Sequence, residues 1–154
     1  MMSRYDLYAD LLYRLALANV QDREDAEDIV HDVFVRYMEK KPHFHDEEHE
    51  KAWFVRVTIN LCRDFLRKRQ YRNYVPLDQV GDIQFEEPKQ TEVLTYLSKL
   101  PEKYRTVIVL HYLEGYSVKD ISDILRISAS AVKMRLSRGR ELLKNNIERE
   151  DDHV

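Results

Sequence analysis

Basic and small polar side chains gather between residues 126 and 144, where they could bind DNA. This stretch carries six bases and one acid, a net charge of +5. Guanidinium and ammonium groups can pair with phosphates, and arginine, lysine and serine can also hydrogen-bond to base edges. The bases are Arg126, Lys133, Arg135, Arg138, Arg140 and Lys144. The composition of this stretch therefore favours nucleic acid as a partner.

The spacing of apolar residues over 117–143 predicts two helices joined by a tight turn. Ser117 and Ser128 can cap the N-termini of these helices, and Ile127 can fill the angle between them. The apolar faces of the two helices are formed by Val118, Ile121, Leu125, Val132, Leu136 and Leu143. The sequence thus predicts a helix-turn-helix whose second helix is basic.

At about 100° per residue, the second helix separates its buried stripe from a free face that can enter a major groove. The side chains predicted on that free face are Ser130, Lys133, Met134, Ser137 and Arg138. Arg135 and Arg140 lie on the flanks, where they can reach phosphates. The alternative is a helical hairpin whose basic face is only solvated.

The net charge of −3 hides two further patches along the chain. Residues 22–50 carry eleven acids and four bases, and residues 53–74 carry six bases and one acid. One acidic and two basic patches predict two contacts with a polyanion and one contact with a different partner.

Few breakers interrupt the chain, which has three glycines and four prolines in 154 residues, and this favours an all-α fold. We expect helices over 5–19, from the cap Asp22 to before Pro42, and from Lys51 to Arg72. Residues 91–100 and 101–114 predict two more helices before the helix-turn-helix, with Gly115 as a stop. Two small helical domains, 1–72 and 91–148, are therefore expected on either side of a flexible linker, 73–90.

A single cysteine, Cys62, excludes an internal disulfide framework and fits a reducing compartment. No apolar run approaches the roughly 20 residues of a membrane span, and the N-terminus lacks a signal pattern. We therefore expect a cytoplasmic protein without membrane insertion. The sequence contains no phosphate loop, HExxH pattern or nucleophile elbow, so we expect no catalytic residues, no cofactor and no enzyme activity.

Four stretches in order resemble bacterial sigma factors of the extracytoplasmic-function group of the sigma-70 family. They are DREDAEDIVHDVFVRYME at 22–39, AWFVRVTINLCRDFLRKR at 52–69, LPEKYRTVIVLHYLEGYSVKDISDIL at 100–125 and ISASAVKMRLSRGRELL at 127–143. The resemblance implies a region 2-like module at 1–72 and a region 4-like helix-turn-helix domain at 91–148. It also implies an alternative sigma factor that directs core RNA polymerase to promoters and promotes melting.

The resemblance assigns a partner to each patch. The polymerase clamp coiled coil would meet the acidic helix, whose candidate residues are Asp25, Glu27, Asp28, His31 and Asp32. The melted −10 element would meet the basic helix, whose candidate residues are Arg56, Asn60, Arg63, Arg67 and Lys68. The −35 element would meet Ser130, Lys133, Met134, Arg135, Ser137, Arg138 and Arg140. The polymerase flap and an anti-sigma factor are further partners that the resemblance implies.

Several interpretations remain open at this point. The acids at 25–32 can also be a solvated helix face stabilised by the helix dipole. His43, His45 and His49 could suggest zinc, but a loop without cysteines is a poor structural site, so we expect no metal. A dimeric helix-turn-helix regulator that acts without polymerase is the main alternative function, and a protein-binding helical adaptor is a third.

Overall fold

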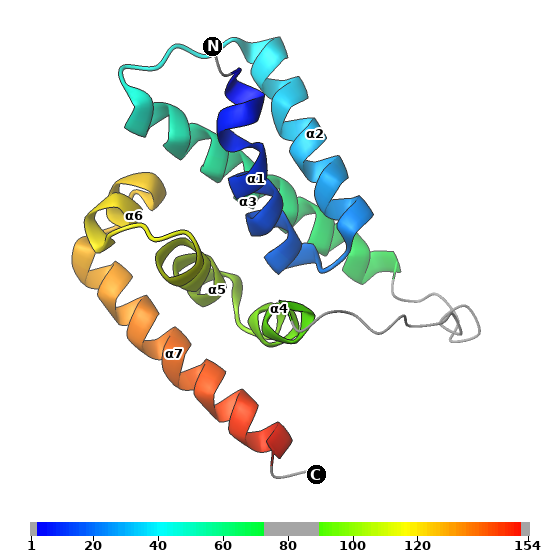
Figure 1. Cartoon of the computed structure of the whole chain (residues 1–154), viewed down its shortest axis with the longest axis vertical. Helices are drawn as coiled ribbons and strands as arrows, with labels where there is room; N and C mark the ends of the chain where they lie inside the picture. Colours follow the sequence, from blue (N-terminus) through cyan, green and yellow to red (C-terminus); the bar gives the residue numbers. More distant parts are fainter. Residues whose placement is uncertain (1–2, 73–89, 152–154) are drawn as a thin grey trace.

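Seven α-helices and one π-helix make up the part of the chain that the structure describes. The structure is a computed structural model that describes residues 3–72 and 90–151, and no strand occurs in those ranges. The elements are α1 (Arg4–Val20), α2 (Arg23–Lys40), α3 (Glu47–Arg72), α4 (Gln90–Ser98), α5 (Glu102–Ile108), η2 (Val109–Leu113), α6 (Val118–Leu125) and α7 (Ala129–Asp151). Figure 1 shows their arrangement, which confirms the all-α prediction.

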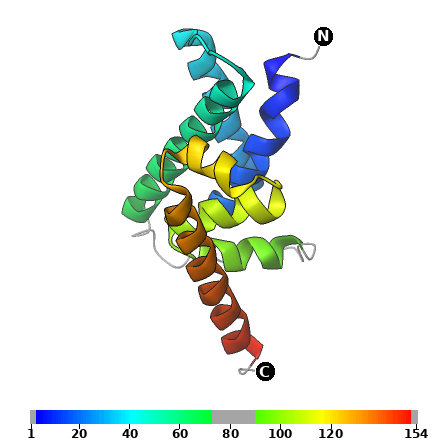
Figure 2. The same ribbon diagram turned by 90° about the vertical axis from the view of Figure 1, so that its left-hand side faces the viewer.

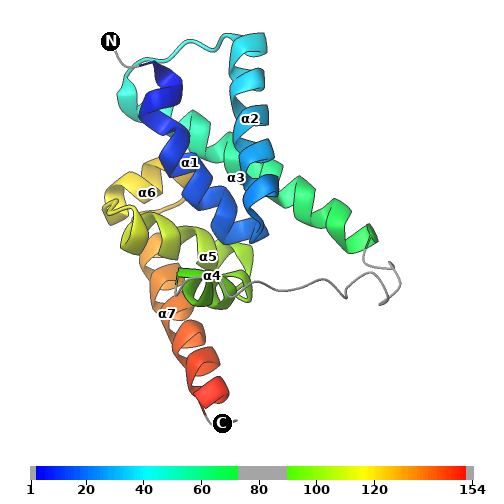
Figure 3. The ribbon, with the colours of Figure 1, turned by 45° about the vertical axis from the view of Figure 1, so that its right-hand side comes forward.

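Helices α1, α2 and α3 pack together as the N-terminal half (Figure 3). Asp22 caps α2 as predicted, because its side chain accepts a backbone hydrogen bond from the first turn. Helix α3 begins at Glu47, four residues before the predicted start at Lys51. Asp46 accepts the backbone N–H of His49 at 2.7 Å, and acids in the first turn favour the positive end of the helix dipole. Residues 47–50, which come before the predicted start of this helix, are therefore helical.

The most buried face of α3 lies one residue beyond the four-residue spacing of Trp53, Val57, Leu61 and Phe65. Phe54 and Val55 are fully buried, whereas Trp53 is half-buried. The Trp53 ring packs edge-on against Tyr37 and Phe44, with centroids 6.2 and 6.0 Å apart. Trp53 thus flanks the core instead of filling it.

Helices α4 to α7 form the C-terminal half, in which α6 and α7 are the predicted helix-turn-helix. The last turns of the helix before it are widened into the π-helix η2, where the N–H of Glu114 donates to the carbonyl of Val109 at 3.0 Å. Gly115 follows with a φ of +76°, a conformation that favours glycine. The predicted stop at Gly115 is confirmed.

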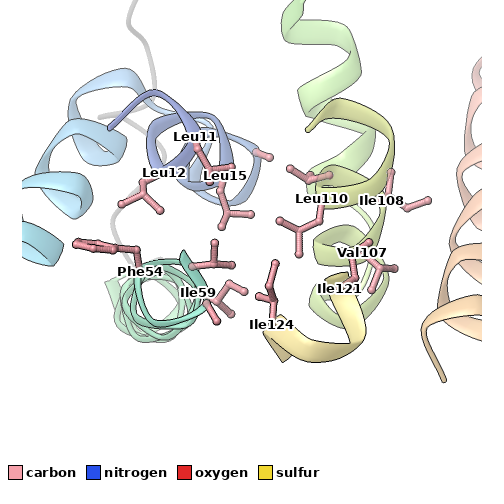
Figure 4. Packing of buried hydrophobic residues seen from close by; sticks show 14 of the residues in the cluster. Leu11, Leu12, Leu15, Phe54, Ile59, Val107, Ile108, Leu110, Ile121 and Ile124 are labelled. Atoms are coloured by element: carbon pink, nitrogen blue, oxygen red, sulfur yellow. The ribbon is translucent and has the colours of Figure 1, made fainter. Parts of the chain in front are cut away.

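The two halves pack against each other around one apolar cluster. Helix α1 contacts α4 and α5, and α3 contacts α6, so the C-terminal half covers one side of the three-helix bundle (Figure 2). Leu15 and Ile59 of the N-terminal half lie opposite Leu110 and Ile124 of the C-terminal half (Figure 4). All four side chains are buried, at most 6% exposed. The two expected modules therefore share a core.

The chain passes between the halves after Arg72, where α3 ends, and before Gln90, where α4 begins. The expected linker, 73–90, lies outside the described residues except for its last position. Among the described helices, none combines the length and the apolar character needed to cross a bilayer.

Candidate nucleic-acid interface

The predicted reading face of α7 is open to solvent over its whole length. Val132 and Leu136 are buried on the opposite side, at 0% and 5% exposed, whereas Met134 is 69% exposed. The residues predicted to face the groove are all exposed, namely Ser130, Lys133, Met134, Ser137 and Arg138. The separation of core and free face that the helical period predicted is confirmed, and DNA contact by these side chains stays a prediction.

The two flanking arginines of α7 differ in their surroundings. Arg140 is exposed, and its Nη1 donates to the hydroxyl of Tyr112 in η2 at 2.7 Å. This bond uses one of five guanidinium N–H donors, so the others stay free for a phosphate. Arg135 is half-buried and lies on the wall of a cavity between the two halves. The sequence predicts the same kind of position for both arginines, but in the structure only Arg140 is exposed, whereas Arg135 lines the cavity.

Local capping interactions define both ends of α6 and the start of α7. Ser117 and Asp120 form a reciprocal capping box at the start of α6. The N–H of Ala131 donates to Ser128 Oγ at 3.0 Å, so both predicted serine caps are confirmed. Arg126 ends α6 with a φ of +58°, in the left-handed region where glycine is favoured.

Gly139 lets α5 and α7 approach closely. A Cβ at this position would lie 3.1 Å from Ile108 Cγ1 and 3.3 Å from Tyr104 Cβ. By propensity alone, a glycine inside a helix lowers the stability of that helix. In the fold, α7 packs against α5 at this glycine.

The five predicted −10 residues divide into two groups along α3. Arg67 and Lys68 are exposed at its C-terminal end. Arg56 donates from Nη1 to the carbonyl of Ile124 in α6 at 2.9 Å. Arg63 makes two parallel bonds to the carboxylate of Glu102 in α5, at 3.0 and 2.8 Å. Two candidate DNA contacts are therefore engaged by the chain's own C-terminal half.

A cavity of about 360 Å³ opens beside these two contacts, between α3 and the C-terminal half. Its walls are formed by Arg56, Ile59, Asn60, Arg63, Glu102, Lys103, Thr106, Leu125, Ile127 and Arg135. Four basic side chains face one acid there, so the cavity is electropositive. Burial, and then the nearby charge of Arg126, lower the pKa of the Arg56 guanidinium.

Two further pairs of hydrogen-bonded side chains join the halves, and the sequence did not point to either of them. Arg14 of α1 makes a two-bond ion pair with Glu114, at 2.8 and 2.7 Å. Arg105 is 5% exposed, and its Nε donates to Asn19 Oδ1 at 2.8 Å. The partners in these pairs lie 100 and 86 residues apart, so no local pattern could have found them.

The predicted polymerase-facing acids lie along the outer side of α2. Glu27, Asp28 and His31 line a shallow groove of about 700 Å³ between α1 and α2. Asp32 is exposed outside this groove, and Asp25 is half-buried at the start of the helix. Burial, and then the charge of Asp22, raise the pKa of Asp25. The structure thus brings three of the five residues together on one groove wall.

The histidine-rich segment before α3 is organised by local contacts. The backbone N–H of His45 donates to His49 Nδ1 at 3.2 Å, and the two rings stack with centroids 5.3 Å apart. Within residues 3–72 and 90–151, no group of three or more histidine, cysteine or acidic side chains is arranged to hold a metal ion.

Comparison with protein families assigns both halves of the chain. The model for sigma-70 region 2 matches residues 4–72, and the model for sigma-70 region 4 matches residues 90–143. The match therefore covers the acidic helix and the basic helix as well as the helix-turn-helix. A dimeric regulator without polymerase, the main alternative from the sequence, is not favoured by this pair of regions.

Curated relatives span nearly the whole chain. The ECF RNA polymerase sigma factor SigW of Bacillus subtilis is 30% identical, over 92% of this chain and 86% of that protein. The ECF RNA polymerase sigma factor SigM of the same organism is 33% identical, over 91% of this chain and 90% of its own length.

Two solved structures share the fold. The sigma factor RpoE, solved in complex with the anti-sigma factor NepR from Bartonella quintana, matches with a TM-score of 0.67 and 22% identity over 94% of both chains. CnrH, solved with the cytosolic domain of CnrY, matches with a TM-score of 0.72 and 24% identity over 94% of this chain and 84% of CnrH. Together with the matches to regions 2 and 4, these findings establish that the chain belongs to the extracytoplasmic-function sigma factors of the sigma-70 family.

Proposed function

We propose that this chain directs core RNA polymerase to promoters by reading the −35 element with α7 and by binding the melted −10 element with α3. The observation that carries the proposal is the free face of α7. It presents exposed basic and polar side chains over a buried stripe, in the geometry that a major groove accepts. The chain acts as a DNA-recognition subunit and not as an enzyme.

At the −35 element, the exposed side chains have different tasks. Lys133 and Arg138 can donate to purine acceptors, and Met134 offers an apolar contact of the kind that a thymine methyl accepts. Ser130 and Ser137 can donate or accept at base edges. Arg140, anchored on Tyr112, and Arg135 would reach phosphates and fix the register of α7 on the duplex.

At the −10 element, α3 offers a basic track for a single strand. Arg67 and Lys68 are exposed in the structure, where the two halves pack together. Arg56, Asn60 and Arg63 line the cavity between the halves and would also contact the strand when the halves separate. A basic groove combined with polar and stacking contacts is how proteins hold unpaired strands.

Polymerase would bind two further surfaces of the chain. The clamp coiled coil fits the α2 surface of Asp25, Glu27, Asp28, His31 and Asp32, where acids meet a groove between α1 and α2. The flap would bind the C-terminal half. We also propose an anti-sigma factor as a partner and the cytoplasm as the place of action, with functional domains at 1–72 and 91–148 joined by 73–90.

The −35 assignment is tested with holoenzyme reconstituted from core polymerase and the chain. This holoenzyme first selects its promoters from a pool of genomic fragments. Lys133→Ala combined with Arg138→Ala should weaken promoter binding at least about tenfold, since each base contact contributes roughly 1–3 kcal/mol. The charge-matched control is Lys40→Ala combined with Arg149→Ala, two exposed positions away from the reading face. Equal affinities for the two double variants would refute the assignment.

A further inference from the structure

The cavity beside α3 holds more positive charge than its one acid can balance. Arg56, Arg63, Lys103 and Arg135 line it together with Glu102. The two parallel bonds between Arg63 and Glu102 balance one of the four cations. Among the side chains that the structure describes, no carboxylate pairs with the other three. A negatively charged ligand would supply the counter-charge that the chain itself does not provide.

The wall of this cavity also contains a buried hydroxyl group without a partner. Thr106 is 3% exposed, and its Oγ1 makes no hydrogen bond within the described part of the chain. A threonine inside a helix can donate to the carbonyl of the preceding turn, as Thr58 of α3 does to Phe54 at 2.7 Å. A buried hydroxyl without such a bond destabilises the fold, so Thr106 has a hydrogen bond to gain from a ligand.

The remaining walls suit an organic ring. Ile59, Leu125 and Ile127 provide apolar surface, and the Asn60 amide offers both donors and an acceptor. An asparagine amide can pair with the edge of a purine base in this way. The cavity volume of about 360 Å³ lies in the range of small-molecule sites. The space therefore fits a phosphate group that carries an organic part.

We propose that this cavity binds a nucleoside di- or triphosphate, with the phosphates on the basic side chains and Thr106 and the base against the apolar wall beside Asn60. The ligand would contact α3 of the N-terminal half and α5, α6 and α7 of the C-terminal half at the same time. Its guanidinium ligands would use the geometry in which arginine binds phosphate elsewhere. The inference goes beyond the proposed promoter function and does not depend on it.

The first test measures the binding of ATP, GTP, CTP and UTP to the free full-length chain by calorimetry, in a buffer without divalent cations. At least one of them should bind as a single molecule per chain. Sodium pyrophosphate should bind more weakly, and the matching nucleoside should not bind measurably, because the cavity uses both parts of the nucleotide. The proposal is overturned if none of the four binds, or if pyrophosphate binds as tightly as the best of them.

Two variants then locate the site, with the nucleotide that binds most tightly as the probe. Thr106→Val removes the hydroxyl and keeps the shape, so the affinity should fall at least about tenfold, as for a lost hydrogen bond to a charged group. Lys103→Gln removes one exposed cation and should weaken binding about threefold. Lys144→Gln, at an exposed position of α7 outside the cavity, is the charge-matched control. If it weakens binding as much as Lys103→Gln does, the nucleotide binds the basic helix and the proposal is overturned.

Thermal unfolding without nucleotide separates a ligand-binding role of Thr106 from a structural one. Thr106→Val loses no hydrogen bond within the chain, so its melting temperature should equal or exceed that of the parent chain. Thr58→Val, the matched control, loses its bond to Phe54 and should melt at a lower temperature. A Thr106→Val chain that melts as early as Thr58→Val would show that the hydroxyl has a structural partner, and the proposal would fail.

Glu102→Gln tests the phosphate contact of Arg63 with the opposite sign. The carboxylate holds the two donors of Arg63 that a phosphate would use. Loss of its charge should therefore raise the affinity for the same nucleotide by up to about threefold. Glu39→Gln, at an exposed position of α2, makes the same charge change and should leave the affinity unchanged. Equal gains in the two variants would assign the effect to net charge and overturn the proposal.

Discussion

At the scale of single residues, Arg105 carries a charge into the centre of the molecule. Its Nε donates to Asn19 Oδ1 at 2.8 Å, and its Nη1 donates to the carbonyls of Ser98 and Leu100 at 3.2 and 3.0 Å. No carboxylate from residues 3–72 or 90–151 bonds to this guanidinium, and burial lowers its pKa. Its hydrogen bonds must therefore offset most of the cost of desolvation.

Removal of the Asn19 acceptor should show how much the desolvation of the Arg105 guanidinium costs in stability. Asn19→Ala leaves a buried donor of Arg105 unpaired, so the free energy of unfolding should fall by about 2 kcal/mol. Asn145→Ala, on an exposed turn of α7, should change the same quantity by less than about 0.5 kcal/mol. Urea unfolding of the two variants compares them directly. Equal midpoints would mean that water replaces the Asn19 side chain at no cost.

The buried thiol of Cys62 should make the free energy of unfolding depend on pH in the alkaline range. Burial raises its thiol pKa from the ordinary 9.0 to about 12 in the folded chain. The unfolded chain therefore loses this proton first, and the stabilisation present below pH 9 is lost as the pH rises toward 12.

The stability difference between the parent chain and Cys62→Ala isolates this thiol from all other titrating groups. Between about pH 8 and about pH 10.5 the difference should shift against the parent chain by about 2 kcal/mol. Urea unfolding at the two pH values measures it. A difference that stays constant over this range would show that the folded thiol titrates as an ordinary cysteine does.

At the scale of elements, the turn of the helix-turn-helix contains a conformational strain. Arg126 closes α6 with φ +58° and ψ +45°, a left-handed conformation that is unfavourable for a residue with a Cβ. Arg126→Gly should raise the free energy of unfolding by about 1 kcal/mol. Arg126→Ala removes the same charge but keeps the Cβ, so it should gain less in a thermal unfolding comparison. Equal gains would assign the effect to the repulsion between Arg126 and Arg56.

Most elements could be predicted from the sequence because their signals are local. The types and positions of three residues predict caps, at Asp22, Ser117 and Ser128, and Gly115 predicts a stop. The sequence predicts the start of α3 at Lys51, because the acids and histidines before it resemble a loop in composition. They are helical because Asp46 caps that turn and acids suit a helix N-terminus. The reading face of α7 follows from its period alone.

At the scale of the whole molecule, the docking of the two halves could not be predicted. The period of a helix shows which face is buried but not which partner covers it. Arg63 and Glu102 lie 39 residues apart on separate helices, and each looks by itself like a solvated surface charge. Ile124 has the same ambiguity, since its buried side chain meets α3 and not only its own half. The covered −10 site is therefore a property of the assembled fold.

We propose above all that this chain gives core polymerase its choice of promoter. The most direct measurement is run-off transcription from a pool of genomic fragments, with core polymerase alone and with core polymerase plus the purified chain. We predict new transcripts that start at defined positions and share two upstream elements, and that disappear with Lys133→Ala combined with Arg138→Ala. If the chain adds no start site, and instead binds duplex DNA as a dimer without polymerase, the proposed sigma function is contradicted.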